Sequence, residues 1–133
     1  MTPDQQQARR DAQARNRYFV ITLARITGAA LALCLAHHGL AHRFITLQTA
    51  DRHPSKPHPS MAQRAMYEAG ASPETTIMIG DTSFDMAMAV AAGSHALGVA
   101  WGYHPPEELI LAGASRVAAT PASLPGHLED YLA

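Results

Sequence analysis

The sequence contains a single cysteine, Cys34, among 133 residues. An intrachain disulfide and a cysteine-rich zinc site are therefore excluded, and one cysteine fits a reducing compartment, so we expect a cytoplasmic protein. The chain also lacks a run of Lys and Arg, and its formal net charge is −1. Nucleic-acid binding consequently has no electrostatic support. Residues 1–17 are polar and lack the apolar centre and cleavage site of a secretory signal.

An uninterrupted hydrophobic run of membrane-spanning length is missing as well. Residues 18–36 hold one charge, Arg25, and about 20 apolar residues would suffice to cross a bilayer. However, Thr22, Thr27 and Gly28 interrupt this stretch, and an arginine in mid-membrane costs about 2.5–3.5 kcal/mol. We therefore expect a strand and a helix here rather than a membrane span.

What is present is the composition of a globular protein, with 47% hydrophobic and 16% charged residues. Apolar runs rich in β-formers alternate with helical stretches, which indicates an α/β fold with a parallel sheet. We expect residues 1–17 to form a polar N-terminal segment with a helix and residues 18–133 to form the α/β core. The expected strands lie at 18–22, 44–47, 76–79, 96–101 and 116–118, and the expected helices end at Gly39, Gly70, Gly93 and Gly113.

Two carboxylates four residues apart follow the third expected strand. Asp81 lies at the strand's carboxyl end, where open α/β sheets bind ligands, and Asp85 falls on the first turn of the next helix. Two carboxylates this close repel each other, and a hard cation such as Mg²⁺ would relieve the repulsion. The alternative is that Asp81 only caps the helix and that Asp85 interacts with the helix dipole.

Lys56 and Thr22 are the candidate phosphate-binding residues. Pro57 and Pro59 stiffen the loop that carries Lys56, so its charge is held in place and suits a phosphoryl oxygen. Thr22 ends the first expected strand, where its hydroxyl would face the same edge of the sheet. The alternatives are an ordinary surface lysine and a threonine that only fills a β-position.

Taken in order, these motifs resemble the haloacid-dehalogenase (HAD) superfamily, in particular its phosphoglycolate-phosphatase-like branch. The matching segments are the strand ending in Thr22, 55–59 (Ser-Lys-Pro-His-Pro), 77–85 (Ile-Met-Ile-Gly-Asp-Thr-Ser-Phe-Asp) and 98–103 (Gly-Val-Ala-Trp-Gly-Tyr), and the resemblance runs from about Ala12 to Leu128. It implies a Rossmann-like three-layer fold and a phosphomonoesterase that acts on a small phosphorylated metabolite.

The resemblance also implies a role for each candidate. Asp81 would bind Mg²⁺, and Asp85 would support the metal or orient Lys56. Lys56 would stabilise the phosphorylated nucleophile, and Thr22, preferred here over Thr27, would bind the transferring phosphoryl group.

The sequence departs from the family pattern at the nucleophile. The family's Asp-x-Asp motif lies on a central N-terminal strand, between the strands that end at Thr22 and Asp81, and no such motif occurs here. The stretch between Thr22 and Lys56 is also too short for a cap domain. A second departure is the helix after Thr22, where residues 29–36 are all apolar although a covering helix needs a polar face.

Two functions follow as expectations. The first is a fragment or subunit of a Mg²⁺-dependent hydrolase whose nucleophile comes from a separately encoded N-terminal half or from sequence removed from a longer parent. The sheet would be completed by that N-terminal half or by a homo-oligomer. The second is a non-catalytic descendant that binds phosphate or a protein partner.

Overall fold

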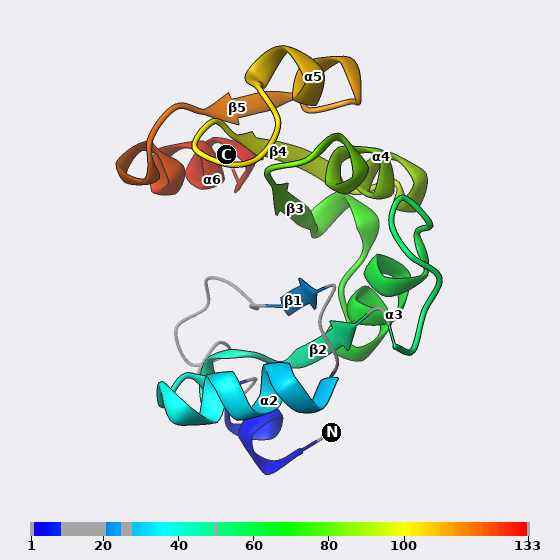
Figure 1. The fold of residues 1–133 in the computed structure, drawn as a ribbon, viewed down its shortest axis with the longest axis vertical. Helices are drawn as coiled ribbons and strands as arrows, with labels where there is room; N and C mark the ends of the chain where they lie inside the picture. The colour runs from blue at the N-terminus through cyan, green and yellow to red at the C-terminus, as the bar shows by residue number, and fades with distance from the viewer. Residues whose placement is uncertain (1, 9–20, 25–27, 50, 133) are drawn as a thin grey trace. The chain divides into compact units, whose positions relative to one another are not determined.

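A computed structural model describes residues 2–8, 21–24, 28–49 and 51–132 (Figure 1). The chain divides into two compact units. Unit 1 comprises 1–55 and 60–71, and unit 2 comprises 56–59 and 72–133. The boundary expected between residues 17 and 18 lies outside the described residues, and residues 3–8 are helical.

In addition to the helical residues 3–8, the described part of unit 1 contains a two-stranded parallel sheet and the helices α2 and α3. Strand β1 (Ile21–Ala24) pairs with β2 (Thr46–Thr49) in a register that places Thr22 opposite Leu47. Helix α2 (Gly28–His37) and the short 3₁₀ helix η1 (Ala41–Arg43) lie between the strands in sequence, and α3 (Ser60–Ala69) follows them. Gly39 and Gly70 follow α2 and α3 with φ of 65° and 67°, a left-handed conformation that glycine adopts without a steric penalty.

Both strands of unit 1 end later than the sequence predicts. Strand β1 continues to Ala24, so Thr22 is its second residue and does not end it; residues 18–20 lie outside the described residues. Strand β2 begins two residues after the predicted start at Phe44. The predicted strand stops at Leu47 because the next two residues, Gln48 and Thr49, are polar. Strand β2 is nevertheless buried, since Thr46, Gln48 and Thr49 are each at most 4% exposed.

Unit 2 contains a three-stranded parallel sheet of order β3-β4-β5. Its strands are β3 (Ile77–Gly80), β4 (His95–Val99) and β5 (Arg116–Ala118), and its helices are α4 (Ser83–Ala92), α5 (Pro106–Leu111) and α6 (Leu124–Leu132). Two 3₁₀ helices, η2 (Pro73–Thr75) and η3 (Pro121–Ser123), precede β3 and α6. The α/β class with parallel pairing is thus confirmed, whereas α6 was not predicted.

The core of unit 2 lies around the central strand. Ala96, Leu97 and Val99 of β4 are buried, and Leu109 of α5 and Met88 of α4 are fully buried in the same unit. Strand β3, at one edge of the sheet, is more open, because Ile79 is 43% exposed. An exposed apolar side chain on a parallel strand is unusual, since both faces of such sheets are normally covered.

Helix α2 has the all-apolar surface that the sequence indicates. Leu31 and Leu35, one turn apart, are buried, whereas Leu33 is 73% exposed and Cys34 is exposed. Only one stripe of this helix therefore packs against unit 1. Among the described residues, no helix is both long and apolar enough to cross a membrane.

Candidate functional site

The candidate site lies at the carboxyl end of β3, where the chain turns into α4. Thr82 is the N-cap of α4: its backbone is extended and its hydroxyl accepts a hydrogen bond from the Asp85 amide at 3.3 Å. Asp85 returns the bond, because its Oδ2 accepts from the Thr82 amide at 3.1 Å and from the Thr82 hydroxyl at 2.8 Å. This reciprocal capping box fixes the first turn of α4 and the direction of the Asp85 carboxylate.

Lys56 reaches this carboxylate from the loop 56–59, which belongs to unit 2 and directly precedes α3. Its Nζ lies 2.6 Å from Asp85 Oδ1, and the two side chains are 12% and 7% exposed. The peptide bond from Lys56 to Pro57 is cis. Both oxygens of Asp85 therefore contact protein donors, and the lysine charge is fixed by a partly desolvated ion pair. The structure thus brings together two of the candidates, Lys56 and Asp85.

Asp81 is held mainly through the loop after β4. Its Oδ2 accepts a hydrogen bond from the Tyr103 amide at 2.9 Å, and its backbone carbonyl accepts one from the His104 amide at 3.0 Å. Within the described part of the chain, no protein donor contacts Asp81 Oδ1. Asp81 therefore has a fixed, half-buried carboxylate with one oxygen available to a ligand.

Two glycines leave room for these carboxylates. A Cβ on Gly80 would lie 2.3 Å from Asp85 Cβ, and a Cβ on Gly102 would lie 2.1 Å from Asp81 Cβ. Neither distance is compatible with a side chain unless the carboxylate moves. Each glycine thus permits close approach of backbone to one acidic side chain.

His104 fastens the same loop to the start of α4. Its Nδ1 accepts a hydrogen bond from the Ser83 amide at 2.8 Å and also lies 3.6 Å from Glu108 Oε2. These contacts require different protonation states, because Nδ1 cannot accept from Ser83 while it carries a proton for Glu108. The bond from the Ser83 amide is the shorter of the two contacts, and it requires a neutral imidazole with its proton on Nε2.

Gly102, Tyr103 and His104 carry no predicted role. Their contacts with Asp81 and Ser83 join segments about twenty residues apart, so no short sequence motif predicts these contacts. The tract of Trp101, Gly102 and Tyr103 was recognisable only as part of the resemblance.

Thr22 lies in unit 1, and its backbone pairs with Leu47. The alternative residue, Thr27, lies outside the described residues. Lys56, Asp81 and Asp85 all belong to unit 2. A phosphate-binding role for Thr22 therefore stays a prediction.

The site offers few protein oxygens that could bind a divalent cation. Among the described residues, no group of three or more His, Cys, Asp or Glu is arranged to hold a metal ion. A full protein cage is not needed for Mg²⁺, which keeps several waters and binds through one or two carboxylates together with substrate phosphate. The available oxygen of Asp81 fits that mode, whereas Asp85 is already hydrogen-bonded at both oxygens.

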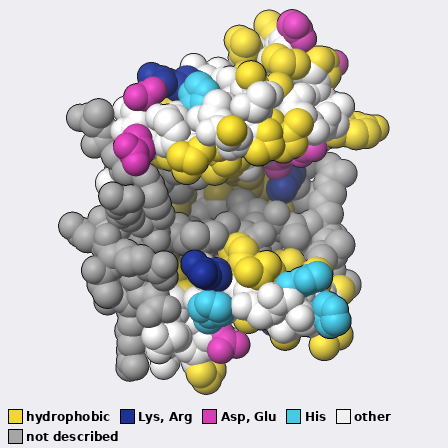
Figure 2. Space-filling view, turned by 90° about the vertical axis from the view of Figure 1, so that its left-hand side faces the viewer, with side chains coloured by type: hydrophobic (Ala, Val, Ile, Leu, Met, Phe, Trp, Pro, Cys, Tyr) yellow, Lys and Arg dark blue, Asp and Glu magenta, His cyan; other side chains and the backbone are white. Residues whose placement is uncertain are grey.

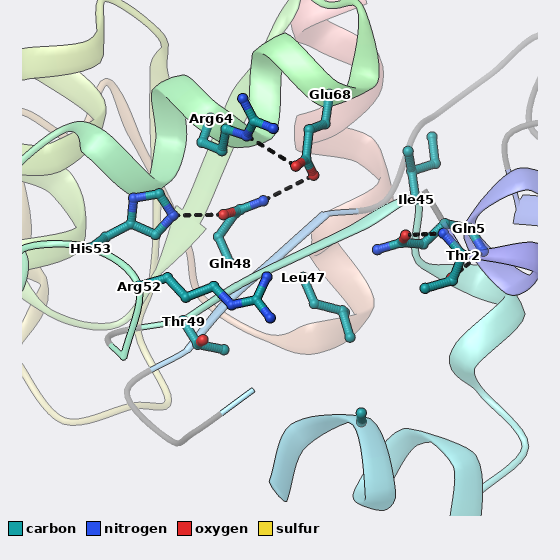
Figure 3. A pocket seen from close by; sticks show the side chains of 11 residues that line it. Thr2, Gln5, Ile45, Leu47, Gln48, Thr49, Arg52, His53, Arg64 and Glu68 are labelled. Atoms are coloured by element: carbon teal, nitrogen blue, oxygen red, sulfur yellow. Dashed lines mark hydrogen bonds and ion pairs between the residues drawn. The ribbon is translucent and has the colours of Figure 1, made fainter. Parts of the chain in front are cut away.

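Unit 1 has a separate cavity of about 770 Å³ beside β2 and α3 (Figure 3). Polar side chains on one wall bond to one another. His53 lies 2.7 Å from both Gln48 and Ser60, Gln48 donates to Glu68 at 3.0 Å, and Glu68 accepts from Arg64 at 3.0 Å. This network explains how a strand as polar as β2 is buried without unpaired groups.

Comparisons with known proteins define the class of this chain. The model of the HAD-hydrolase-like family matches residues 53–127, which include Lys56, Asp81 and Asp85. The chain belongs to the HAD-like hydrolase family, whose members include phosphatases.

Two curated relatives are phosphatases by name. The chain is 51% identical over 57 residues to "probable phosphatase IndB" of Dickeya dadantii, covering 43% of this chain and 24% of the relative. It is 40% identical over 65 residues to pyrophosphatase PpaX of Oceanobacillus iheyensis, covering 47% and 30%. The matches thus span less than a third of the length of either relative.

Solved structures match over nearly the whole chain. A HAD family hydrolase from Deinococcus radiodurans, with bound phosphate and sodium, aligns with a TM-score of 0.75 at 24% identity and covers 98% of this chain and 59% of its own. A hydrolase from Pseudomonas syringae aligns at 0.68 with 26% identity, covering 97% and 60%. These likenesses confirm the HAD-type Rossmann-like fold.

Proposed function

We propose that this chain supplies the metal-binding and phosphate-binding half of a phosphomonoesterase of the phosphoglycolate-phosphatase-like type. The observation that carries the proposal is the pairing of a fixed Lys56 with Asp85, next to an Asp81 carboxylate that has one available oxygen. All three groups belong to unit 2 and are positioned by the turn from β3 into α4.

Each residue has a separate task in this proposal. Asp81 binds Mg²⁺, which would neutralise charge on the phosphoryl oxygens. Asp85 orients Lys56, because its own oxygens are already hydrogen-bonded. Lys56 places its ammonium group against a phosphoryl oxygen, and phosphoryl transfer depends largely on such positioning and charge neutralisation.

The attacking carboxylate has to come from elsewhere, because these 133 residues contain no Asp-x-Asp motif. We propose that a segment outside this sequence supplies it, either a separately encoded N-terminal half or another part of a longer chain. Strand β3 offers a sheet edge for such a strand, and the partly exposed Ile79 lies on it.

Metal binding tests the first part of the proposal. Calorimetric titration of the full chain with Mg²⁺ should give weak binding, and Asp81→Asn should weaken it by at least about tenfold, or roughly 1.4 kcal/mol. Asp130→Asn is the matched control, because Asp130 forms only an exposed pair with Arg116. Unchanged Mg²⁺ binding in Asp81→Asn would show that Asp81 is structural.

Turnover tests the second part. The pure chain should not hydrolyse p-nitrophenyl phosphate, and activity should appear when a neighbouring reading frame that encodes an Asp-x-Asp half is co-expressed. Mg²⁺-dependent hydrolysis by the chain alone, abolished in Asp81→Asn, would overturn the proposed division of the active site.

A second candidate is a non-catalytic phosphate-binding or partner-binding protein. The lack of an Asp-x-Asp motif in the sequence and the exposed apolar stripe on α2 favour it. It predicts phosphate binding that never leads to turnover, even with an Asp-x-Asp half present.

A further inference from the structure

Three rings lie on the two segments that carry and hold the Asp81 and Asp85 carboxylates. The ring of His104 packs against Phe84, with centroids 5.9 Å apart, and against Tyr103, with centroids 5.2 Å apart. Phe84 belongs to the first turn of α4, immediately before Asp85, and Tyr103 donates its amide to Asp81. We call Phe84, Tyr103 and His104 the ring cluster.

The ring cluster is open to solvent although it is largely apolar. Tyr103 is 82% exposed and Phe84 is 41% exposed, whereas His104 between them is mostly covered. Hydrophobic side chains also gather at the surface of unit 2 more generally (Figure 2). Single exposed apolar residues are ordinary, but rings in mutual contact beside a candidate catalytic carboxylate offer a surface to a ligand.

The backbone beneath the rings is firmly held. Gly102 lies against Asp81, the His104 amide bonds to the Asp81 carbonyl, and the His104 ring bonds to the Ser83 amide. The position of Tyr103 relative to Asp81 is therefore set before a ligand arrives. Preorganised aromatic surfaces bind with little loss of conformational freedom.

Charged groups and uncharged rings lie on different parts of the site, which fits a ligand with a charged phosphoryl group and an uncharged leaving group. Lys56 and Asp81 are the charged groups that would face a phosphoryl group and its metal. The ring cluster itself is uncharged, because His104 is neutral while it accepts from Ser83, and Glu108 is the acidic side chain close to it. The three rings therefore carry no charge that would pair with an anionic leaving group.

We propose that the ring cluster binds the leaving group of the phosphate ester and makes the site prefer planar, aromatic leaving groups over small aliphatic ones. The inference rests on the proposed function, because the phosphoryl group must bind at Asp81 and Lys56 for the leaving group to reach the rings. Tyr103 and Phe84 are the specificity residues, and His104 positions them.

The test compares ligands that share the phosphate and differ in the leaving group. Phenyl phosphate, methyl phosphate and inorganic phosphate are titrated into the full chain with saturating Mg²⁺, by calorimetry and by the emission of Trp101. Trp101 is the sole tryptophan of the sequence and precedes Gly102. Phenyl phosphate should bind about fivefold tighter than methyl phosphate, which is the size of one ring contact.

Substitutions then assign the preference. Tyr103→Ala and Phe84→Leu should each weaken phenyl phosphate binding more than methyl phosphate binding, and so reduce the phenyl-to-methyl ratio toward about one. Tyr67→Ala is the matched control, because Tyr67 is an equally exposed tyrosine of α3 in the other unit, and it should leave the ratio intact. Phe84→Leu keeps an apolar side chain and so separates a ring effect from general hydrophobicity.

The outcomes distinguish this inference from the proposed function. Equal binding of phenyl and methyl phosphate, both abolished by Asp81→Asn, would overturn the role of the ring cluster while the phosphate site stands. A phenyl preference that survives Tyr103→Ala and Phe84→Leu would also overturn it. No detectable binding of any of the three phosphates would refute the phosphate site and this inference together.

Discussion

Two ion pairs, one in each unit, are held in opposite ways. In unit 2, Lys56 and Asp85 form a pair that is nearly buried, and Thr82 saturates the second carboxylate oxygen. In unit 1, Arg64 and Glu68 are one turn apart on α3, and the arginine side chain is 53% exposed. The first pair joins segments 29 residues apart, whereas the second joins residues four apart on one helix.

The Lys56 ammonium is thus held in a fixed position, whereas the Arg64 guanidinium is largely solvated. A buried pair is a poor source of stability, because desolvation offsets much of the Coulombic attraction. It is instead an effective way to fix a side chain, and Lys56 is a residue that the proposed function requires to be fixed. The family match also covers Lys56 and nearly all of unit 2, but only part of unit 1.

The largest expected effect comes from removing the cation of the buried pair, with the exposed pair as the comparison. Lys56→Met leaves the Asp85 carboxylate without its cation in a site with little water, so unfolding should become easier by about 3 kcal/mol. Arg64→Met removes an exposed pair of the i, i+4 type and should cost about 0.5 kcal/mol. Urea denaturation followed by far-UV circular dichroism measures both.

The emission of Trp101 reports on unit 2 in the same titrations. Its transition should move in Lys56→Met and stay in place in Arg64→Met. Equal losses of stability in the two variants would contradict the contrast between the two units.

A smaller effect is expected at the glycines of unit 2. Gly80→Ala places a methyl group against Asp85 Cβ and should destabilise the protein by about 1–3 kcal/mol, the usual range for overpacking. Gly126→Ala is the matched control within α6, because a Cβ there meets nothing within 4 Å. The control should be neutral or stabilising by about 0.5 kcal/mol, since alanine favours helices. Thermal unfolding of the two variants side by side decides, and a Gly80→Ala variant as stable as Gly126→Ala would show that Asp85 can move freely.

The local parts of this architecture are predictable from the sequence. Gly70 and Gly93 end α3 and α4 where expected, because left-handed glycines act within one turn. The N-cap of α4 is Thr82 and not Asp81, which the alternative interpretation had placed there. The family resemblance of the lysine and aspartate motifs is confirmed by the family match. The roles of those residues remain predictions.

The parts that depend on distant contacts were not predictable. Strand β2 was placed too early, because Gln48 and Thr49 are polar; Gln48 is buried through its hydrogen bonds to Thr46 and to Glu68 of α3. Helix α6 was missed, since Pro125 and Gly126 near its start are residues that normally disfavour a helix. The loop that holds Asp81 through Tyr103 has no local signature at all.

The smallest expected effect concerns the apolar surface of α2 in unit 1. Leu33→Gln changes a side chain that is 73% exposed, so the free energy of unfolding should stay within about 0.5 kcal/mol of the parent. Leu35→Gln is the comparison on the same helix, because Leu35 is buried and an amide there lacks partners, which should cost about 2 kcal/mol or more.

The denaturation midpoints of these two variants, measured at several protein concentrations, show what lies on this face. If Leu33→Gln costs as much as Leu35→Gln and the cost grows with protein concentration, Leu33 is covered in solution by another copy of the chain. In that case α2 would be an interface, and its all-apolar surface would be explained by packing on both sides. If Leu33→Gln is neutral at every concentration, α2 packs through the Leu31 and Leu35 stripe alone, and Leu33 is exposed in solution as Ile110 and Leu111 are on α5 of unit 2.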